Sequence, residues 1–463
     1  MRLFAGLCLA ALFSWAVPAL AQDKLPNVVF ITVDTLRADH LSSWGYHLKT
    51  SPNIDNLAAQ GMRYENAYTV TSRTAPSHYS MFTSRYPQEH GSKLNGFAVP
   101  EKTKFLFLPQ IFQKNGYDNA AFVSSWVLTE RLTKLGRFFN VYDDDLNRKY
   151  QTINSMRWAE DVAPKAVSWL RQKKDQQKPF FLWVHLFDPH SPYELREEFD
   201  ATEKTGAPDH TKDRGEDAVM TDVRAYNSEI LYTDHYVGKI VDALDEMGLA
   251  DNTLVVLVAD HGESLGENNT DQGHGHWLWE SVVRVPMILR WPGKIEAGRV
   301  ETARVSTIDL MPTIVDLTIK RTKPDTVIPT EYAGRSLSDN LLAGADLPDR
   351  IVRFVAFAGQ KWIMPKWFAK LWLRDLDFPL RVGYRQGDRK VLWTPEKETI
   401  DIVNLDRDPF GMHPASPAEG TPEYTSEVDS LTNWFRATHL EQNGENRRTA
   451  KDVEALESLG YIQ

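Results

Sequence analysis

Long apolar runs without polar alternation dominate the hydrophobic pattern of the first two thirds of this chain. NVVFITV ends just before Asp34, and TLVVLVA ends just before Asp260. Such runs are typical of strands that are buried on both faces of a parallel sheet covered by helices. Helix-like stretches such as 226–247 separate the runs and carry apolar residues at helical spacing. Residues 26–320 therefore predict an α/β domain with a central, mostly parallel sheet flanked by helices.

The pattern changes in the last third of the chain. Residues 322–350 are rich in Pro, Gly, Asp and Thr, which is typical of a connection that leads out of a domain. The segments RVGYRQGDRKVLWT (381–394) and TIDIVNLDRDP (399–409) predict an antiparallel sheet. We therefore expect a main domain over residues 22–345 and a smaller α+β domain over residues 346–463.

Three further segments are interpreted from their local pattern. Met1-Arg2, an apolar run and Ala19-Leu20-Ala21 are typical of a secretory signal peptide over residues 1–21. The tryptophan-rich segment 361–378 is expected to pack in the smaller domain, although its interleaved cations would also suit a lipid or anionic glycan surface. A helix is expected at 450–459.

Composition narrows the setting further. The 463 residues carry a formal net charge of −10 without a Lys- or Arg-rich tract to offset it, which argues against nucleic acid as a substrate. The only cysteine, Cys8, lies in the predicted leader, so the mature chain is expected to lack disulfides and thiolate ligands. Export without disulfides favours a bacterial periplasm, with secretion further out as the alternative. No later segment reaches about 18 uninterrupted apolar residues, so no integral membrane segment is expected in the mature chain.

A hydroxyl, two acids and an imidazole form the strongest candidate constellation. Thr74 stands in TSRTAPSHYSMFTSRYPQEHG, where Pro76 suits the first turn of a helix. A side-chain oxygen there faces unpaired N–H groups and the positive end of the helix dipole, which favour an alkoxide and a bound oxyanion. Ligands of α/β sheets bind at the carboxyl ends of strands, where Asp34, Asp260 and His261 fall. With Thr74 they make a suitable four-ligand set for a divalent cation, whereas either acid alone could simply cap a helix.

The motifs around these residues resemble those of the sulfatase family of the alkaline phosphatase superfamily. The family's opening is matched by VDTLRADHLSSWGY (33–46), its central histidine motif by FFLWVHLFDPHSPY (180–193), and its second half by LVADHGESLGEN (257–268) and VSTIDLMPTIVDL (305–317). The resemblance covers most of residues 26–320. It implies an alkaline phosphatase-like fold, a metal-dependent site and hydrolysis of sulfate or phosphate esters.

Several positions depart from the sulfatase pattern. Sulfatases carry C-x-P-S-R or S-x-P-S-R, whose first residue is oxidised to formylglycine. Here the pentad is TAPSH, with Thr74 at the nucleophile position and His78 in place of Arg. Because threonine has a methyl group on Cβ, the same oxidation gives no aldehyde, and gem-diol chemistry is not expected.

The metal-ligand positions depart as well. The family's Asp-Asp pair is here Asp34-Thr35, and His261 stands where many sulfatases have Asn. Fewer carboxylates and an imidazole favour zinc or manganese, with calcium as the alternative. This pattern is similar to phosphoethanolamine transferases and related phosphodiesterases, whose nucleophile is an unmodified threonine.

Most of the thirteen histidines are expected to be structural. By resemblance, His190 and His274 match residues that contact the transferred group, where they would stabilise charge on nonbridging oxygens or protonate the leaving oxygen. His276 is the alternative to His274. His185, on an apolar run, is expected to be a satisfied core histidine. For His78 two roles stay open, orienting Thr74 as a base or facing the helix interior.

One divalent cation is expected rather than two. Alkaline phosphatases and nucleotide pyrophosphatases hold a second cation with another acid and two histidines, which Asp188, His190 and His274 could supply. However, Asp188 and His190 are only two positions apart, closer than in those enzymes.

The expected function is a secreted, metal-dependent hydrolase of phosphate mono- or diesters or of sulfate esters, acting through a covalent Thr74 intermediate. The substrate would be a small molecule or a glycan- or lipid-linked ester. A phosphoryl transferase of the phosphoethanolamine-transferase type is the alternative, and a non-catalytic binder of sulfated or phosphorylated glycans is a third possibility. Transferases of that type usually carry transmembrane helices before this domain, so the hydrolase is favoured.

Overall fold

The computed structural model describes residues 24–101, 103–146, 156–201, 216–266, 272–328, 331–357, 379–411, 413–438 and 445–446. The predicted signal peptide, the segment 361–378 and the predicted helix at 450–459 lie outside these ranges. None of the helices within the described ranges combines the length and apolar character needed to cross a membrane.

An eight-stranded sheet forms the middle layer of the molecule, in the order β11-β2-β10-β8-β1-β7-β5-β6. β1 pairs in parallel with β7 and β8, and β5 pairs in parallel with β7, whereas β10 runs antiparallel to β8. The predicted, mostly parallel sheet is therefore confirmed. Its strands are β1 (Asn27–Val33), β2 (Met62–Tyr64), β5 (Asp118–Val123), β6 (Val141–Asp143), β7 (Phe180–Leu186), β8 (Thr253–Ala259), β10 (Met287–Arg290) and β11 (Arg299–Glu301).

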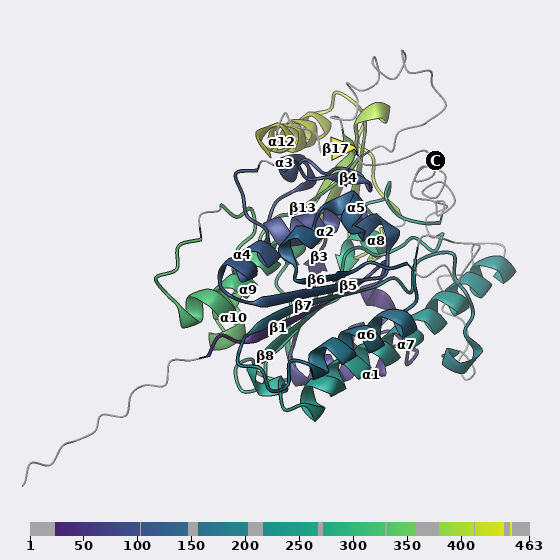
Figure 1. Ribbon diagram of the computed structural model, residues 1–463. Helices are drawn as coiled ribbons and strands as arrows, with labels where there is room; N and C mark the ends of the chain where they lie inside the picture. The colour runs from purple at the N-terminus through teal and green to yellow at the C-terminus, as the bar shows by residue number, and fades with distance from the viewer. Residues whose placement is uncertain are drawn as a thin grey trace, which may run out of the picture.

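Helices cover both faces of this sheet, which is why its central strands read as continuous apolar runs. Figure 1 shows α1 (Pro52–Gln60), α6 (Ala159–Arg171) and α7 (Glu216–Glu246) below the sheet. Above it lie α2 (Thr74–Thr83), α4 (Leu108–Lys114) and α9 (Leu310–Val315), and α10 (Ser338–Ala343) lies at the left side of the sheet in this view. Every residue of β1, β7 and β8 is buried. The helix predicted at 226–247 is confirmed and already begins at Glu216.

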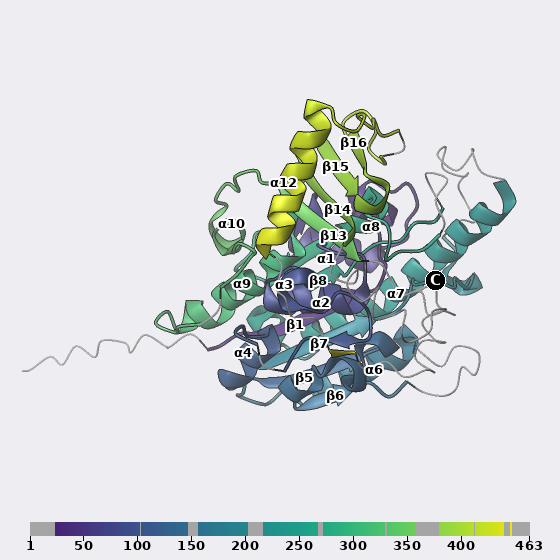
Figure 2. The same cartoon turned by 90° about the horizontal axis from the view of Figure 1, so that it is seen from above.

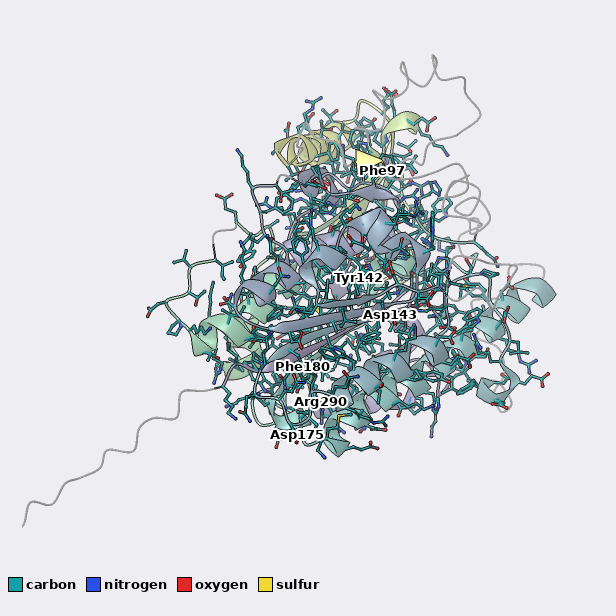
Figure 3. The ribbon with its side chains drawn as sticks, viewed as in Figure 1. Phe97, Tyr142, Asp143, Asp175, Phe180 and Arg290 are labelled. Carbon is teal, nitrogen blue, oxygen red and sulfur yellow. The ribbon has the colours of Figure 1, made fainter. Side chains whose placement is uncertain are left out.

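Charged side chains occupy the edge of the sheet at β6. Asp143, labelled in Figure 3, forms ion pairs with Arg157 and Lys165. Charges on an edge strand discourage pairing with another chain. Protection of an edge strand does not explain the buried polar groups at the centre of the sheet, where β1 and β8 end.

A second, antiparallel sheet follows in the chain, in the order β13-β14-β15-β16. It confirms the sheet predicted at 381–394 and 399–409 and adds one strand before it. Figure 2 shows α12 lying across one face of this sheet, where Leu431 and Phe435 of the helix share a core with Val382. The elements are β13 (Val352–Phe357), β14 (Pro379–Gln386), β15 (Arg389–Thr394), β16 (Thr399–Asn404) and α12 (Pro422–Thr438).

Two contacts connect the second sheet to the first part of the chain, near the segment that leads into α2. The backbone N–H of Val355 donates to the carbonyl of Val70 (2.9 Å). Lys390 on β15 forms a buried ion pair with Glu280 (2.8 Å). Short elements complete the described fold: β3 (Ala67–Tyr68), α3 (Pro87–His90), β4 (Phe97–Ala98), α5 (Glu130–Thr133), α8 (Glu280–Val283), β9 (Arg284–Val285), β12 (Val305–Ser306) and β17 (Glu445–Asn446).

Candidate active site and metal centre

Two carboxylates meet at the ends of the two central strands. Val33 at the end of β1 pairs with Ala259 at the end of β8, so the next residues, Asp34 and Asp260, are neighbours. Both side chains are completely buried. The backbone N–H groups of Thr35 (3.3 Å) and His261 (2.8 Å) donate to Asp260 Oδ1. This leaves Asp260 Oδ2 and both oxygens of Asp34 without a hydrogen-bond partner among the described residues.

The ring of His261 is oriented so that Nε2 faces these oxygens. Nδ1 lies 2.9 Å from the carbonyl of Gly262, which only accepts, so the ring proton sits on Nδ1. The Nε2 lone pair then lies 3.7 Å from Asp34 Oδ1 and 3.6 Å from Asp260 Oδ2. A histidine whose Nδ1–H is held by a carbonyl while Nε2 faces carboxylates is the arrangement that metal-binding histidines adopt.

Thr74 is the first residue of α2, at the helix start that Pro76 indicated, and its hydroxyl joins the same cluster. Thr74 Oγ1 lies 3.4 Å from His261 Nε2, and the side chain is completely buried. The Ser77 hydroxyl, one turn further along α2, donates to the carbonyl of Asp260 (2.7 Å). The start of the helix is therefore fixed to the end of β8, which sets the position of the Thr74 hydroxyl against both acids.

The spacing and chemistry of this cluster suit a divalent cation. His261 Nε2 lies 3.4–3.7 Å from one oxygen each of Thr74, Asp34 and Asp260. A tetrahedron with edges of this length has metal–ligand bonds of about 2.1–2.3 Å, close to the values found for zinc. Adjacent ligands of a six-coordinate calcium would be similarly spaced, but calcium takes oxygen ligands and the imidazole does not provide one.

The electrostatics of these side chains also favour a bound cation. Burial raises the pKa of Asp34 well above its usual range, and the charge of Glu263 adds to the effect. Burial likewise raises the pKa of Asp260, with a further contribution from Asp34. Burial and the neighbouring His274 lower the pKa of His261. Acceptor atoms thus converge with only the Thr74 hydroxyl among these side chains to donate to them, and a bound cation would offset the cost of ionising both acids.

The two predicted catalytic histidines lie beside this cluster. The ring centroids of His261 and His274 are 4.4 Å apart, and those of His274 and His190 are 4.9 Å apart. His274 Nδ1 lies 2.7 Å from Glu263 Oε1, and His190 Nδ1 lies 2.6 Å from the carbonyl of Ser191. Both rings are therefore oriented through Nδ1. Glu263 is a further residue of the candidate site that the sequence did not reveal, since nothing in DHGES shows that it reaches His274.

For His78 the geometry favours the second of the two roles left open. Its Nδ1 lies 2.8 Å from the carbonyl oxygen of Thr74, and its Nε2 lies 3.0 Å from Thr32 Oγ1. No bond from His78 to the Thr74 hydroxyl is present among the described contacts. Burial lowers the pKa of this histidine well below its usual value. His78 is therefore a neutral interior residue that holds the start of α2.

The structure revises the expectation for His185 and agrees with the expectation that Asp188 does not hold a second cation. His185 is not a fully satisfied core histidine, because Nε2 has no hydrogen-bond partner among the described residues and lies 3.5 Å from Asp34 Oδ2. Asp188 is engaged by Arg196 (3.0 Å) and by the backbone N–H of Ala159 (3.0 Å), which speaks against its use for a second cation. The backbone carbonyl of His276 accepts a hydrogen bond from Arg381 (2.9 Å).

Asn95 is a further polar residue that sequence reasoning missed. Its Oδ1 accepts from the backbone N–H of Ala75, directly after Thr74 (2.9 Å), which assigns the other amide atom as Nδ2. Nδ2 has no hydrogen-bond partner among the described residues, and the side chain is 2% exposed. A buried amide donor next to a candidate nucleophile is suited to an anionic oxygen. An asparagine in a loop 21 positions away gives no local signal of this contact.

Comparison with known proteins gives one family. The family model described as Sulfatase matches residues 26–320. An ulvan-active sulfatase of Formosa agariphila is 24% identical over 371 residues, covering 73% of this chain and 70% of the relative. An endo-4-O-sulfatase of Bacteroides thetaiotaomicron is 26% identical over 377 residues, covering 68% of this chain and 73% of the relative.

Solved structures give the same fold. A phosphonate monoester hydrolase of Agrobacterium radiobacter superposes with a TM-score of 0.68 at 19% identity, covering 92% of this chain and 100% of that chain. The corresponding enzyme of Silicibacter pomeroyi gives a TM-score of 0.67 at 19% identity over the same shares. The predicted alkaline phosphatase-like architecture is therefore confirmed.

Proposed function

The chain belongs to the sulfatase family of ester hydrolases, and on that premise we propose that it is a metal-dependent hydrolase that forms a covalent ester on Thr74. The main support for this proposal is the position of Thr74 Oγ1, which lies 3.4 Å from His261 Nε2 and in the same cluster as Asp34 and Asp260. The residues that would hold the cation are Asp34, Thr74, Asp260 and His261. When bound, the cation lowers the pKa of the Thr74 hydroxyl and polarises a nonbridging oxygen of the substrate. Zinc or manganese fits the nitrogen donor better than calcium does.

The first chemical step is a displacement by Thr74. The Thr74 hydroxyl gives its proton to solvent water, and Thr74 Oγ1 then attacks phosphorus or sulfur in line; its new bond to that atom forms as the bond to the departing alkoxide breaks. His274, paired with Glu263, supplies the proton that the departing alkoxide needs. Asn95 Nδ2 would donate to a nonbridging oxygen and stabilise its negative charge. His190, whose Nδ1–H is held by the Ser191 carbonyl, would do the same from Nε2 only after taking up a second proton.

The second step returns the enzyme to its starting state. Water attacks the phosphorus or sulfur atom of the threonine ester and gives a proton to His274. The bond to Thr74 Oγ1 then breaks, and the threonine oxygen takes up a proton from solvent water. If an alcohol replaced water, the same residues would carry out a transfer reaction.

The pentad TAPSH favours phosphate esters over sulfate esters as substrates. A threonine cannot become an aldehyde, so the route that ordinary sulfatases use for sulfate esters is closed to Thr74. The relatives named above include both sulfatases and phosphonate monoester hydrolases, so small-molecule or glycan-linked esters of either kind remain the substrate class to screen. The leader-like residues 1–21 support a periplasmic or secreted location.

An activity screen with two matched variants tests this proposal. Wild type, Thr74→Ala and Thr74→Ser are assayed on aryl phosphate monoesters, diesters, phosphonates and sulfates with added zinc, manganese or calcium. Loss of a nucleophile costs on the order of 10³-fold or more in kcat, so Thr74→Ala should be inactive while Thr74→Ser retains turnover. Undiminished turnover by Thr74→Ala would refute the proposed nucleophile. Absence of turnover in wild type on every substrate class, with unchanged ligand binding in Thr74→Ala, would favour a non-catalytic binder.

A further inference from the structure

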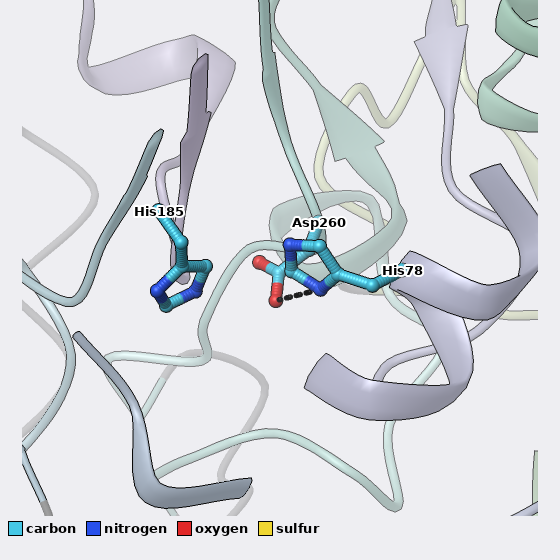
Figure 4. A group of neighbouring side chains, drawn as sticks. All are labelled: His78, His185 and Asp260. Carbon is cyan, nitrogen blue, oxygen red and sulfur yellow. Dashed lines mark ion pairs between the residues drawn. The ribbon is translucent and has the colours of Figure 1, made fainter. Parts of the chain in front are cut away.

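A second group of ligand-type side chains adjoins the first. It consists of His185 on β7, Asp260 after β8 and His78 in α2, whose candidate ligand atoms lie within 4.8 Å of one another. Figure 4 shows the carboxylate of Asp260 between the two rings. All three side chains are completely buried. Because Asp260 also belongs to the Asp34–Asp260–His261 group, the two groups share a carboxylate, as ligands do in bridged two-metal centres.

His185 presents an imidazole lone pair to this place. The Ser124 hydroxyl donates to the carbonyl of His185 (2.5 Å), so Ser124 Oγ accepts from His185 Nδ1–H (3.1 Å). With the proton on Nδ1, Nε2 carries a lone pair and has no hydrogen-bond partner among the described residues. It lies 3.5 Å from Asp34 Oδ2, which also lacks a partner there. Two buried lone pairs that face one another repel unless a proton or a metal cation lies between them.

His78 does not offer a ligand atom in the same way. The atom that lies 3.8 Å from Asp260 Oδ2 is Nδ1, and this nitrogen is held by the carbonyl oxygen of Thr74. The Thr32 hydroxyl accepts from Trp183 Nε1 (2.9 Å), so its own proton can be donated to His78 Nε2. Both nitrogens of His78 are thus used, which leaves His185 as the imidazole of this second group.

We propose that the chain binds a second divalent cation through His185 Nε2, Asp34 Oδ2 and Asp260, so that both carboxylates bridge the two cations. This inference rests on the proposed function, because it adds to the cation held by Asp34, Thr74, Asp260 and His261. Three protein ligands with one position left for water are the usual set of a catalytic zinc site. Asp188 takes no part, since Arg196 and a backbone N–H hold its oxygens.

The second cation would change which esters the site prefers. It adds two positive charges beside Thr74 without adding a protein carboxylate. A phosphate monoester carries more negative charge than a sulfate ester, so it gains more from this field. The binuclear centre therefore favours transfer of a phosphoryl group.

Metal counting on the full chain tests the proposal. Wild type, His185→Ala, His261→Ala and the control His90→Gln are loaded with zinc or manganese, desalted and analysed for bound metal. His90 is also a buried histidine, bonded to Ser80, and lies outside both groups, so its variant reports the structural cost of losing such a ring. The expected counts are two per chain in wild type and His90→Gln and one in His185→Ala.

The possible outcomes separate this inference from the proposed function. One equivalent in wild type, kept in His185→Ala and lost in His261→Ala, would overturn the second cation and leave the proposed function standing. Two equivalents in both wild type and His185→Ala would also overturn it. No bound metal in wild type would overturn the metal dependence itself.

A second measurement uses only the wild-type protein, so its result does not depend on whether a variant folds. Two manganese ions bridged by carboxylates couple magnetically, so the electron paramagnetic resonance spectrum of the manganese-loaded wild type should be that of an exchange-coupled pair. A spectrum of isolated manganese ions at full loading would overturn the proposal.

Discussion

The contact between Glu263 and His274 allows a sharp prediction about leaving groups. Glu263→Gln keeps an oxygen near His274 Nδ1 but removes the negative charge that stabilises the protonated ring. The two side chains are buried and 2.7 Å apart. Hydrogen bonds to charged groups contribute roughly 1.5–3 kcal/mol, and about 1.4 kcal/mol corresponds to a tenfold change in rate. The variant should therefore lose about 10- to 150-fold in kcat wherever proton donation by His274 matters.

The assay compares two substrates of the same charge. An alkyl phosphate needs a proton on its departing oxygen, whereas a nitrophenyl phosphate leaves without one. Glu263→Gln should therefore lose the full factor on the alkyl ester and little on the nitrophenyl ester. A substrate with a better leaving group thus restores the turnover of the variant. Equal losses on both substrates would refute the assignment of His274 as the proton donor and would leave Glu263 with a purely structural role.

Three further predictions follow from individual contacts. Asn95→Asp keeps the acceptor for Ala75 N–H but replaces the donor Nδ2, so kcat/KM should fall by about 100-fold or more, as for loss of an oxyanion donor, and the melting temperature should also fall because a carboxylate is buried. Chelation of metal from wild type should abolish turnover and lower the melting temperature, and zinc or manganese should restore both, because the buried acids then lose their counter-charge. Lys390→Met should destabilise the fold by about 1.5–3 kcal/mol in urea unfolding without changing metal content, because Glu280 loses its bond to Lys390 but keeps Arg385.

The sequence predicted those parts of the site that depend on position along a strand or helix. The apolar runs before Asp34 and Asp260 located the carboxyl ends of β1 and β8, where the two acids meet. Pro76 located the start of α2 and therefore Thr74. Each of these inferences used residues that are close together in the chain, so local pattern was sufficient.

Local sequence pattern does not reveal contacts between segments that are distant in the chain. His185 lies on a fully buried strand and was expected to be satisfied there, yet its Nε2 faces Asp34 from the neighbouring strand. Glu263 and Asn95 act through single contacts that only the folded loops create. An ionisable residue inside an otherwise apolar strand was the one available signal for His185, and burial alone did not distinguish a ligand from a core residue.

The central claim is that Thr74 becomes covalently esterified during turnover. Wild type mixed with an aryl phosphate and quenched in acid should yield a peptide containing Thr74 that carries one additional phosphoryl group by mass spectrometry. The same peptide from Thr74→Ser should carry the group on serine. Steady turnover of the substrate with only unmodified Thr74 at every quench time, including during any initial burst of product, would contradict the account.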